Sequence, residues 1–326
     1  MFVKQGILMK TQSPKKPVLF LIIPCYNEKE IIKLSIDSIN AKAQSLITHN
    51  KISKKSRIVF VNDGSKDETL TLLKKHKTDI MQILSLSTNK GHQSALLAGL
   101  NYAKDKCDCV ISLDCDLQDD INLIDKFIEA FNNGFEVVYG VRNDRKEDSF
   151  FKAYSAMAFY KLMKMLGVDI VYNHADYRLL SNRVLGHLLE FSEVNLFLRG
   201  IIPLLGFKSC KLYYKRNARQ LGVSKYPFFK MLSFAIDGIT SFSVKPLRIL
   251  TFMGAIISAF SIIVGIWALA THFMGYTVSG WTSMISVMCL LGGIQLLGLG
   301  IIGEYIGKIY KETKKRPLYF VDEVIS

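Results

Sequence analysis

The sequence predicts an α/β fold, with helices on a largely parallel sheet, followed by a two-helix transmembrane hairpin. Five short apolar runs alternate with helix-compatible segments up to residue 139, which is the pattern of a buried parallel sheet. Residues 249–270 and 281–303 contain no charged side chain. As helices, these two stretches would each reach roughly 33 Å, enough to cross the hydrocarbon core of a membrane.

The expected strands are the apolar runs at residues 18–23, 57–61, 80–84, 109–113 and 136–139. Ligands of such sheets bind beyond the carboxyl ends of the strands, so the chemistry is expected just after each run. The residues there are polar: PCYNEKE follows the first run, NDGSKDET the second and DCDLQDD the fourth. Asn27 and Glu30 have the spacing of a helix cap. No G-x-G-x-x-G follows the first run and no P-loop motif occurs, so the standard dinucleotide-binding and P-loop classes lose their main support.

The charges around the two apolar stretches predict their orientation. Lys245 and Arg248 precede the first stretch, five cations between residues 308 and 316 follow the second, and the link THFMGYTVSG has neither Lys nor Arg. Both outer flanks, and with them both chain termini, are therefore expected in the cytoplasm. A buried helical hairpin in a soluble domain is the alternative, which the paired lengths and charge asymmetry disfavour. Six glycines between residues 292 and 307 give the second helix a small-residue face, which permits packing within the hairpin or in a homo-oligomer.

Composition narrows the function classes. The 326 residues carry a net charge of +14, which suits nucleic acid, an anionic membrane surface or a phosphorylated substrate. The cations gather at the membrane flanks and no nucleic-acid motif occurs, so nucleic acid is not an expected partner. The six cysteines lack the paired spacing of a zinc site, and they are expected to be reduced structural thiols.

Asp114 and Asp116 are the strongest candidates for metal ligands. They are two residues apart at an expected strand end, so both carboxylates would project to one side, where they can share Mg²⁺ or Mn²⁺. A D-x-D sequence alone is more often a solvated loop or a helix cap. Its position after an apolar strand, with Asp63 and Gly64 in the equivalent place after an earlier strand, favours a metal site.

Several motifs, taken together, carry a resemblance to a known family. PCYNE, NDGSKDET, NKGHQSALLAGL, LDCDLQDD, ADYRLLS and RNARQLGVSKYP occur in this order, and they resemble the family 2 glycosyltransferases, which have the GT-A fold. More narrowly, the chain is similar to the polyprenyl-phosphate hexosyltransferases, the group that contains bactoprenol glucosyltransferases and dolichyl-phosphate mannose synthases. The resemblance runs from about Leu19 to the end of the second apolar stretch.

The resemblance implies a nucleotide-sugar site. Its base and ribose pocket would be lined by Pro24, Tyr26, Asn27 and Glu28. Asp63 would read the base edge, Gly64 and Ser65 would complete that turn, and Gly91 would open a helix that faces the nucleotide. The metal would be surrounded by Asp114, Asp116 and Gln118. His92 is interpreted as a packing residue at the start of the helix.

The resemblance implies that Asp176, in ADYRLLS, lies beside the acceptor and the donor sugar, so it is the expected catalytic residue, together with Asp116. A phosphate monoester acceptor is largely dianionic at neutral pH, because its second pKa is about 6. It scarcely needs a base, so Asp176 is expected to orient the sugar or Arg178 while the acceptor attacks the anomeric carbon directly. Donor or acceptor phosphates are assigned to basic and hydroxyl residues, with a solvated basic face as the alternative: Arg142, Arg178, Arg216, Arg219, Ser224 and Lys225.

The function implied is inverting, metal-dependent transfer of a hexose to undecaprenyl or another polyprenyl phosphate at the cytoplasmic leaflet, for cell-envelope glycan modification. Glucose from UDP-glucose is the preferred donor, and GDP-mannose is the alternative. A processive synthase is disfavoured because Q-x-x-R-W is missing; a noncatalytic nucleotide-sugar sensor stays open. The expected organisation is an N-terminal extension (1–17), a cytoplasmic GT-A domain (18–224), juxtamembrane amphipathic helices (225–246), the membrane helices (247–310) and a cytoplasmic tail (311–326).

Overall fold

The computed structural model describes residues 16–143, 174–191, 193, 198–215, 240, 243–274 and 280–326. The chain divides into two compact units. One unit holds the sheet with its helices and includes the last residues of the chain, Arg316–Ser326. The other unit holds the two long C-terminal helices, and each unit is described by itself.

The first unit is built on an eight-stranded mixed sheet. In chain order its strands are β1 (Leu19–Cys25), β2 (Arg57–Asn62), β3 (Met81–Leu86), β4 (Cys109–Ser112), β5 (Val137–Arg142), β6 (His174–Ser181), β7 (Ser209–Tyr214) and β8 (Val321–Ile325). All five strands expected from the apolar runs are confirmed as β1 to β5. The sequence pattern did not predict β6, β7 or β8.

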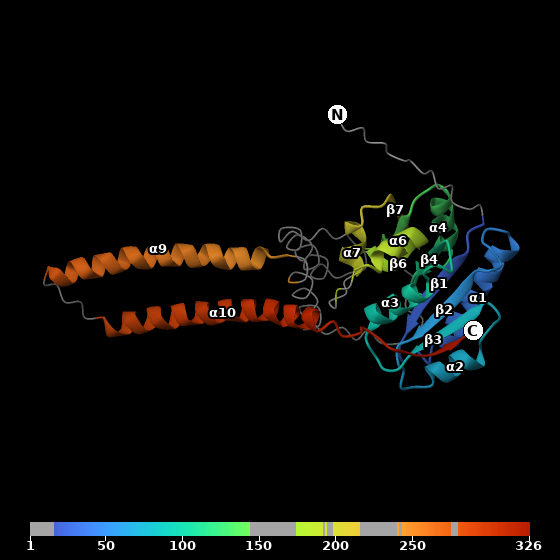
Figure 1. Ribbon diagram of the computed structural model, residues 1–326, viewed down its shortest axis with the longest axis horizontal. Coiled ribbons are helices and arrows are strands. Elements are labelled where there is room, and N and C mark those ends of the chain that lie inside the picture. Colours follow the sequence, from blue (N-terminus) through green and yellow to red (C-terminus); the bar gives the residue numbers. More distant parts are fainter. Residues whose placement is uncertain are drawn as a thin grey trace, which may run out of the picture. The chain divides into compact units, whose positions relative to one another are not determined.

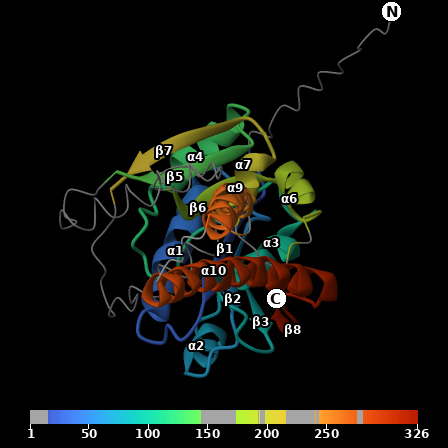
Figure 2. The same cartoon turned by 90° about the vertical axis from the view of Figure 1, so that its left-hand side faces the viewer.

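The order across the sheet is β7-β5-β6-β4-β1-β2-β3-β8. Strands β4, β1, β2 and β3 are parallel to their neighbours in this block, so their carboxyl ends meet at one edge. Strand β6 runs antiparallel between β4 and β5, and it brings its first residues to that same edge. Figure 2 shows β7 at one side of the sheet and β3 with β8 at the opposite side.

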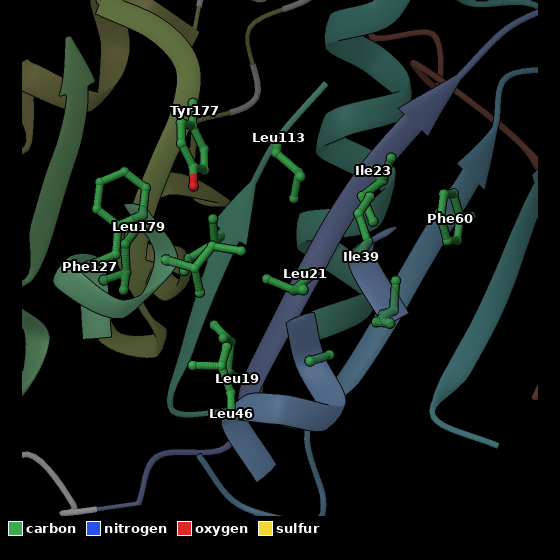
Figure 3. Packing of buried hydrophobic residues seen from close by; sticks show 14 of the residues in the cluster. Leu19, Leu21, Ile23, Ile39, Leu46, Phe60, Leu113, Phe127, Tyr177 and Leu179 are labelled. Atoms are coloured by element: carbon green, nitrogen blue, oxygen red, sulfur yellow. The ribbon is translucent and has the colours of Figure 1, made fainter. Parts of the chain in front are cut away.

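Helices cover both faces of the sheet. On one face, α1 (Ile32–Thr48) and α4 (Leu123–Asn132) bury their apolar stripes against alternate strand residues, as Figure 3 shows for Leu21, Ile39 and Phe127. On the other face, α3 (His92–Ala103) packs so closely that a Cβ on Gly99 would lie 2.3 Å from Ile22. Three short helices complete the unit: α2 (Thr69–Lys75), α6 (Asn182–Leu188) and α7 (Leu198–Leu204).

The end of the chain, expected as a tail, contributes a strand to the sheet. Strand β8 pairs antiparallel with β3 and thereby covers an edge that would otherwise expose unpaired backbone groups. Side chains hold it in place: Lys77 Nζ donates to the Ser326 carbonyl at 2.7 Å, and Asn101 Nδ2 donates to Tyr319 Oη at 2.8 Å. The sheet and the last residues of the chain therefore form one unit.

The second unit contains α9 (Lys245–Phe273) and α10 (Trp281–Lys314), drawn as two long neighbouring helices in Figure 1. In the part of the chain that the structure describes, these are the two helices long and apolar enough to cross a membrane. Leu250 of α9 lies against Gly298 of α10, where an added Cβ would come within 3.2 Å of the leucine. Both expected membrane stretches are thus helical, whereas most of the expected juxtamembrane helices, at 225–239, lie outside the described residues.

Candidate functional site

Two loops at the carboxyl ends of β1 and β2 are tied together. Asn27 has a φ of 53°, its side chain accepts a hydrogen bond from the Lys66 backbone N–H at 2.9 Å, and its own N–H donates to Ser65 Oγ at 3.1 Å. The expected helix cap is wrong, because α1 begins at Ile32 without a side-chain cap. The side chain of Asn27 is used to join the loops instead, and the pair of loops forms a frame for the expected nucleotide pocket.

The other residues expected to line the nucleotide pocket lie on or next to these two loops. Pro24 lies in β1, Tyr26 is partly exposed directly after it, and the Glu28 N–H donates to Thr69 Oγ1 at 2.9 Å. Gly64 has a φ of 60°, and a Cβ there would lie 2.5 Å from the backbone carbon of Thr88. Only glycine fits this close approach, so the turn after β2 depends on it.

Asp63 joins the frame to a third loop. Its carboxylate, which is 2% exposed, accepts from the Lys90 and Gly91 backbone N–H groups at 2.8 and 2.9 Å and from Asn89 Nδ2 at 3.0 Å. Burial raises the pKa of Asp63 more than these donors lower it. Base reading by Asp63 stays a prediction; the geometry adds that its carboxylate positions the loop that leads into α3.

Gly91 caps α3 with a φ of 87°, and His92 is the first residue of the helix. His92 is not a packing residue, which corrects that interpretation. Its side chain is 42% exposed, and Nε2 lies 3.6 Å from both Asp114 Oδ1 and Asp176 Oδ2. Burial lowers the pKa of His92, but the two carboxylates raise it by a larger amount, so the net shift is upward.

Asp114, Asp116 and Gln118 lie on one loop, after β4 rather than at its end. Strand β4 ends at Ser112, so the strand alternation that predicted a shared direction does not apply. A turn replaces it: the Gln118 N–H donates to Asp116 Oδ1 at 3.2 Å, and Leu117 between them has a φ of 56°. The backbone of the loop is also held by Ser35 of α1, whose hydroxyl donates to the Cys115 carbonyl.

The charges on this loop fit a divalent cation. Burial and the neighbouring carboxylates Asp119, Asp176 and Asp116 raise the pKa of Asp114 to about 6, although His92 opposes them. A hard cation would relieve this excess of negative charge and matches carboxylate and amide oxygen donors. Among the described residues, no three His, Cys, Asp or Glu side chains are grouped closely enough to hold a metal ion.

Asp176 lies in β6 at the centre of a charged cluster. It pairs with Arg178 two residues on, and Arg199 of α7 approaches it with two nitrogens, Nε at 3.2 Å from Oδ1 and Nη2 at 2.9 Å from Oδ2. Burial raises the pKa of Asp176, but Arg178, His92 and Arg199 outweigh it and hold the pKa well below its usual range. A carboxylate held this firmly in its ionised form is a weak base, which favours an orienting role.

Sequence reasoning missed Arg199. Its signal was available, since it is the single charged residue in the apolar segment LFLRGIIPLL, residues 196–205. A lone cation in such a segment is expected to have a buried partner. The partner lies 23 positions away along the chain, so only the folded structure could identify it.

The expected phosphate residues are divided by the structure. Arg178 is buried against Asp176. Arg142, at the end of β5, donates to Asp119 at 2.9 Å and to Tyr214 Oη at 3.1 Å. A phosphate role for either arginine stays a prediction. The remaining four lie outside the described residues: Arg216, Arg219, Ser224 and Lys225.

Comparison with known proteins agrees with this architecture. Residues 20–189 match Glycosyl transferase family 2, and residues 245–309 match the GtrB C-terminal hairpin. The chain belongs to glycosyl transferase family 2: it is a glycosyltransferase with the GT-A fold and a C-terminal membrane-associated hairpin.

Two curated relatives extend over nearly the whole chain. The Bacillus subtilis (strain 168) glycosyltransferase YkoT is 48% identical over 309 residues, 94% of this chain and 92% of that protein. The bactoprenol glucosyl transferase of Shigella phage SfX is 37% identical over 305 residues, 92% of this chain and 97% of that protein. The similarity thus includes both the sheet and the hairpin.

Proposed function

We propose that this enzyme transfers glucose from UDP-glucose to a polyprenyl phosphate at the cytoplasmic leaflet, with inversion at the anomeric carbon. The observation that carries the proposal is that His92 Nε2 lies 3.6 Å from both Asp114, on the carboxylate loop, and Asp176, which is bound by arginine, in a chain that also has two membrane-length helices. The bactoprenol glucosyl transferase relatives support both the sugar and the lipid class.

The donor would be bound beside the carboxylate loop. Mg²⁺ or Mn²⁺ held by Asp114, Asp116 and Gln118 would neutralise the diphosphate and the charge that develops on the departing nucleotide. The pocket framed by Asn27 and Ser65 would receive the nucleoside, as the family resemblance implies. Asp63 would act on this pocket through the loop that it fixes.

The acceptor would bring its own nucleophile. An oxygen of the lipid phosphate attacks the anomeric carbon while the bond from that carbon to the diphosphate oxygen breaks, and UDP leaves with the electron pair. No proton has to be removed from a dianionic phosphate. Asp176 would orient the sugar and hold Arg178 and Arg199 in place, and these guanidinium groups suit phosphate oxygens.

Location at the cytoplasmic leaflet rests on charge. Lys245 and Arg248 precede the apolar part of α9, and Lys311, Lys314 and Lys315 follow that of α10. Such flanks remain on the cytoplasmic side. The sheet unit contains residues on both sides of the hairpin in sequence, so it would lie on that side with them.

The test is incubation of the purified full-length chain with polyprenyl phosphate, Mg²⁺ or Mn²⁺, and a panel of UDP and GDP sugars. Labelled glucosyl lipid formed from UDP-glucose, and lost with EDTA, is the expected result. Mannosyl lipid from GDP-mannose would instead establish the alternative donor. Binding of a nucleotide sugar without lipid product from any donor would favour the noncatalytic sensor.

A further inference from the structure

Asp119 anchors the loop that carries the expected metal ligands to strands β5 and β7. This carboxylate is 3% exposed, and its Oδ1 accepts from Arg142 Nη2 at 2.9 Å, from Arg142 Nε at 3.3 Å and from the Tyr214 hydroxyl. Arg142 and Tyr214 are paired neighbours at the ends of β5 and β7. Two outer strands therefore hold a residue next to Gln118.

These contacts are too specific for a solvated ion pair. Removing a carboxylate from water is unfavourable unless charge and hydrogen bonds compensate it. Arg142 supplies the charge, and it also donates to Tyr214 Oη at 3.1 Å, which closes a ring of three groups. Burial lowers the pKa of Arg142, but Asp119 and Tyr214 raise it by a larger amount. The guanidinium therefore stays charged within the ring of three groups.

The loop that these three groups anchor has a strained backbone at Leu117. Leu117 has a φ of 56°, a conformation that is unfavourable for a residue with a side chain and persists where surrounding contacts enforce it. Ser35 holds the loop before Leu117 through the Cys115 carbonyl, and Asp119 holds it after Leu117. Tyr177 adds a third anchor, because its hydroxyl donates to the Asp120 carbonyl at 3.0 Å.

We propose that Asp119 is a positioning residue, which acts through Arg142 and Tyr214 to direct Asp114, Asp116 and Gln118 toward one cation. The inference rests on the proposed metal-dependent function and adds residues to it. Asp119 Oδ1 is held by Arg142 of β5 and Tyr214 of β7. Arg142 then acts on the donor indirectly, by fixing the metal loop, and not as a phosphate ligand.

The test measures Mn²⁺ binding to the full-length chain in detergent, by calorimetry in the presence of UDP. Asp119→Asn and Tyr214→Phe should each weaken Mn²⁺ binding about tenfold or more, because a misdirected ligand lowers affinity strongly. The matched control is Asp125→Asn, which removes a carboxylate paired with Lys42 and Lys51 on α1 and the following loop. It should leave Mn²⁺ affinity unchanged.

A double variant separates positioning from a general loss of stability. If the three groups act as one ring, Asp119→Asn combined with Tyr214→Phe should weaken Mn²⁺ binding little more than Asp119→Asn alone. UDP affinity in EDTA should not change in any variant. Loss of UDP affinity in EDTA with Arg142→Gln, but not with Asp119→Asn, would instead assign Arg142 to phosphate and overturn the proposal.

Two failures are distinguishable. If the unmodified chain binds no Mn²⁺ with UDP, the metal-dependent function falls, and the role of Asp119 falls with it. If the unmodified chain binds Mn²⁺ and both single variants bind it equally well, only the positioning role is overturned. Tyr214→Phe removes a single hydroxyl and retains the buried aromatic side chain. It therefore keeps the test valid if Asp119→Asn fails to fold.

Discussion

Gly64 and Gly134 offer a matched pair at the scale of single residues. Their φ angles are 60° and 81°, but an added Cβ meets the Thr88 backbone at 2.5 Å at Gly64 and nothing within 4 Å at Gly134. Substitution by alanine imposes a similar backbone strain of about 1–2 kcal/mol at either position. The steric clash belongs to Gly64 alone.

Gly64→Ala should therefore weaken UDP binding at least tenfold, because the 87–91 loop must move away from Asp63. Gly134→Ala should lower the thermal midpoint and leave UDP binding intact. Calorimetry with UDP and thermal unfolding of both variants check this. Equal UDP affinities in the two variants would show that the close approach at Gly64 does not shape the pocket.

Asp176 carries the second prediction at this scale. Asp176→Asn removes the charge that compensates Arg178 and Arg199, so turnover with both substrates saturating should fall roughly 100-fold, as for loss of a preorganised electrostatic group. The comparison is Glu136→Gln, which removes a carboxylate paired with Arg183 at 3.2 Å and should keep normal turnover. Near-full turnover of Asp176→Asn would exclude an essential role for its charge.

The pH profile bears on the same residue. Because its pKa is held well below the usual range, Asp176 stays ionised above about pH 5. It should contribute no loss of turnover as the pH falls from neutrality to that value. A group acting as a general base with an ordinary catalytic pKa would produce such a loss.

At the scale of elements, ion pairs join α1 and α4, which cover the same face of the sheet. Asp125 of α4 pairs with Lys42 of α1 and with Lys51 in the following loop. Burial raises the pKa of Asp125, but the two lysines lower it more, so the net shift is downward. The resulting stabilisation is present above about pH 4 and is lost as the pH falls through the lowered folded-state value.

Asp125→Asn should lower the thermal midpoint at pH 7 by about 2 °C, since a partly exposed pair contributes less than about 1 kcal/mol. The difference from the unmodified chain should shrink as the pH falls below about 4 and vanish once both forms lack the charge. Thermal unfolding across this range measures it. A difference that persists at low pH would assign the effect to packing.

The elements that the sequence predicted differ from those it missed in the strength of their apolar pattern. Strands β1 to β5 and helices α9 and α10 follow from local apolar runs, which do not depend on partners. In contrast, β7 alternates exposed and half-buried residues at a sheet edge, and β8 is mostly exposed. Edge strands need less apolar surface, so their pattern is weak and their partners become evident only after the sheet has formed.

At the scale of the whole molecule, the chain leaves the sheet for the hairpin and then returns. Helix α10 ends at Lys314 and β8 begins at Val321. On the way, the Phe320 carbonyl accepts from the Ser87 N–H at 3.0 Å. Ser87 begins the loop that reaches Asp63 through Asn89, Lys90 and Gly91, so the end of the chain supports the loop beside the proposed donor pocket.

Deletion of residues 319–326 should therefore weaken UDP binding about tenfold, while the chain stays in the membrane fraction because α9 and α10 are intact. Calorimetry in detergent and carbonate-washed membranes provide the two measurements. Lys74→Ala is the control, since it removes only the ion pair to Glu323 and keeps β8. Unchanged UDP affinity after deletion would limit β8 to covering the β3 edge.

The sequence by itself determined the central strands, the two long apolar helices and the presence of a carboxylate loop after the fourth strand, and the family resemblance made Asp176 a candidate. These follow from periodicity, charge and short motifs, which are local properties. Tertiary structure alone decided that Arg199 reaches Asp176, that Asp63 holds the loop before α3, that Asp119 joins Arg142 and Tyr214, and that β8 returns to β3. Each of these contacts joins segments far apart in the chain, so it depends on strand order and on the compensation of buried charge, neither of which a local pattern contains.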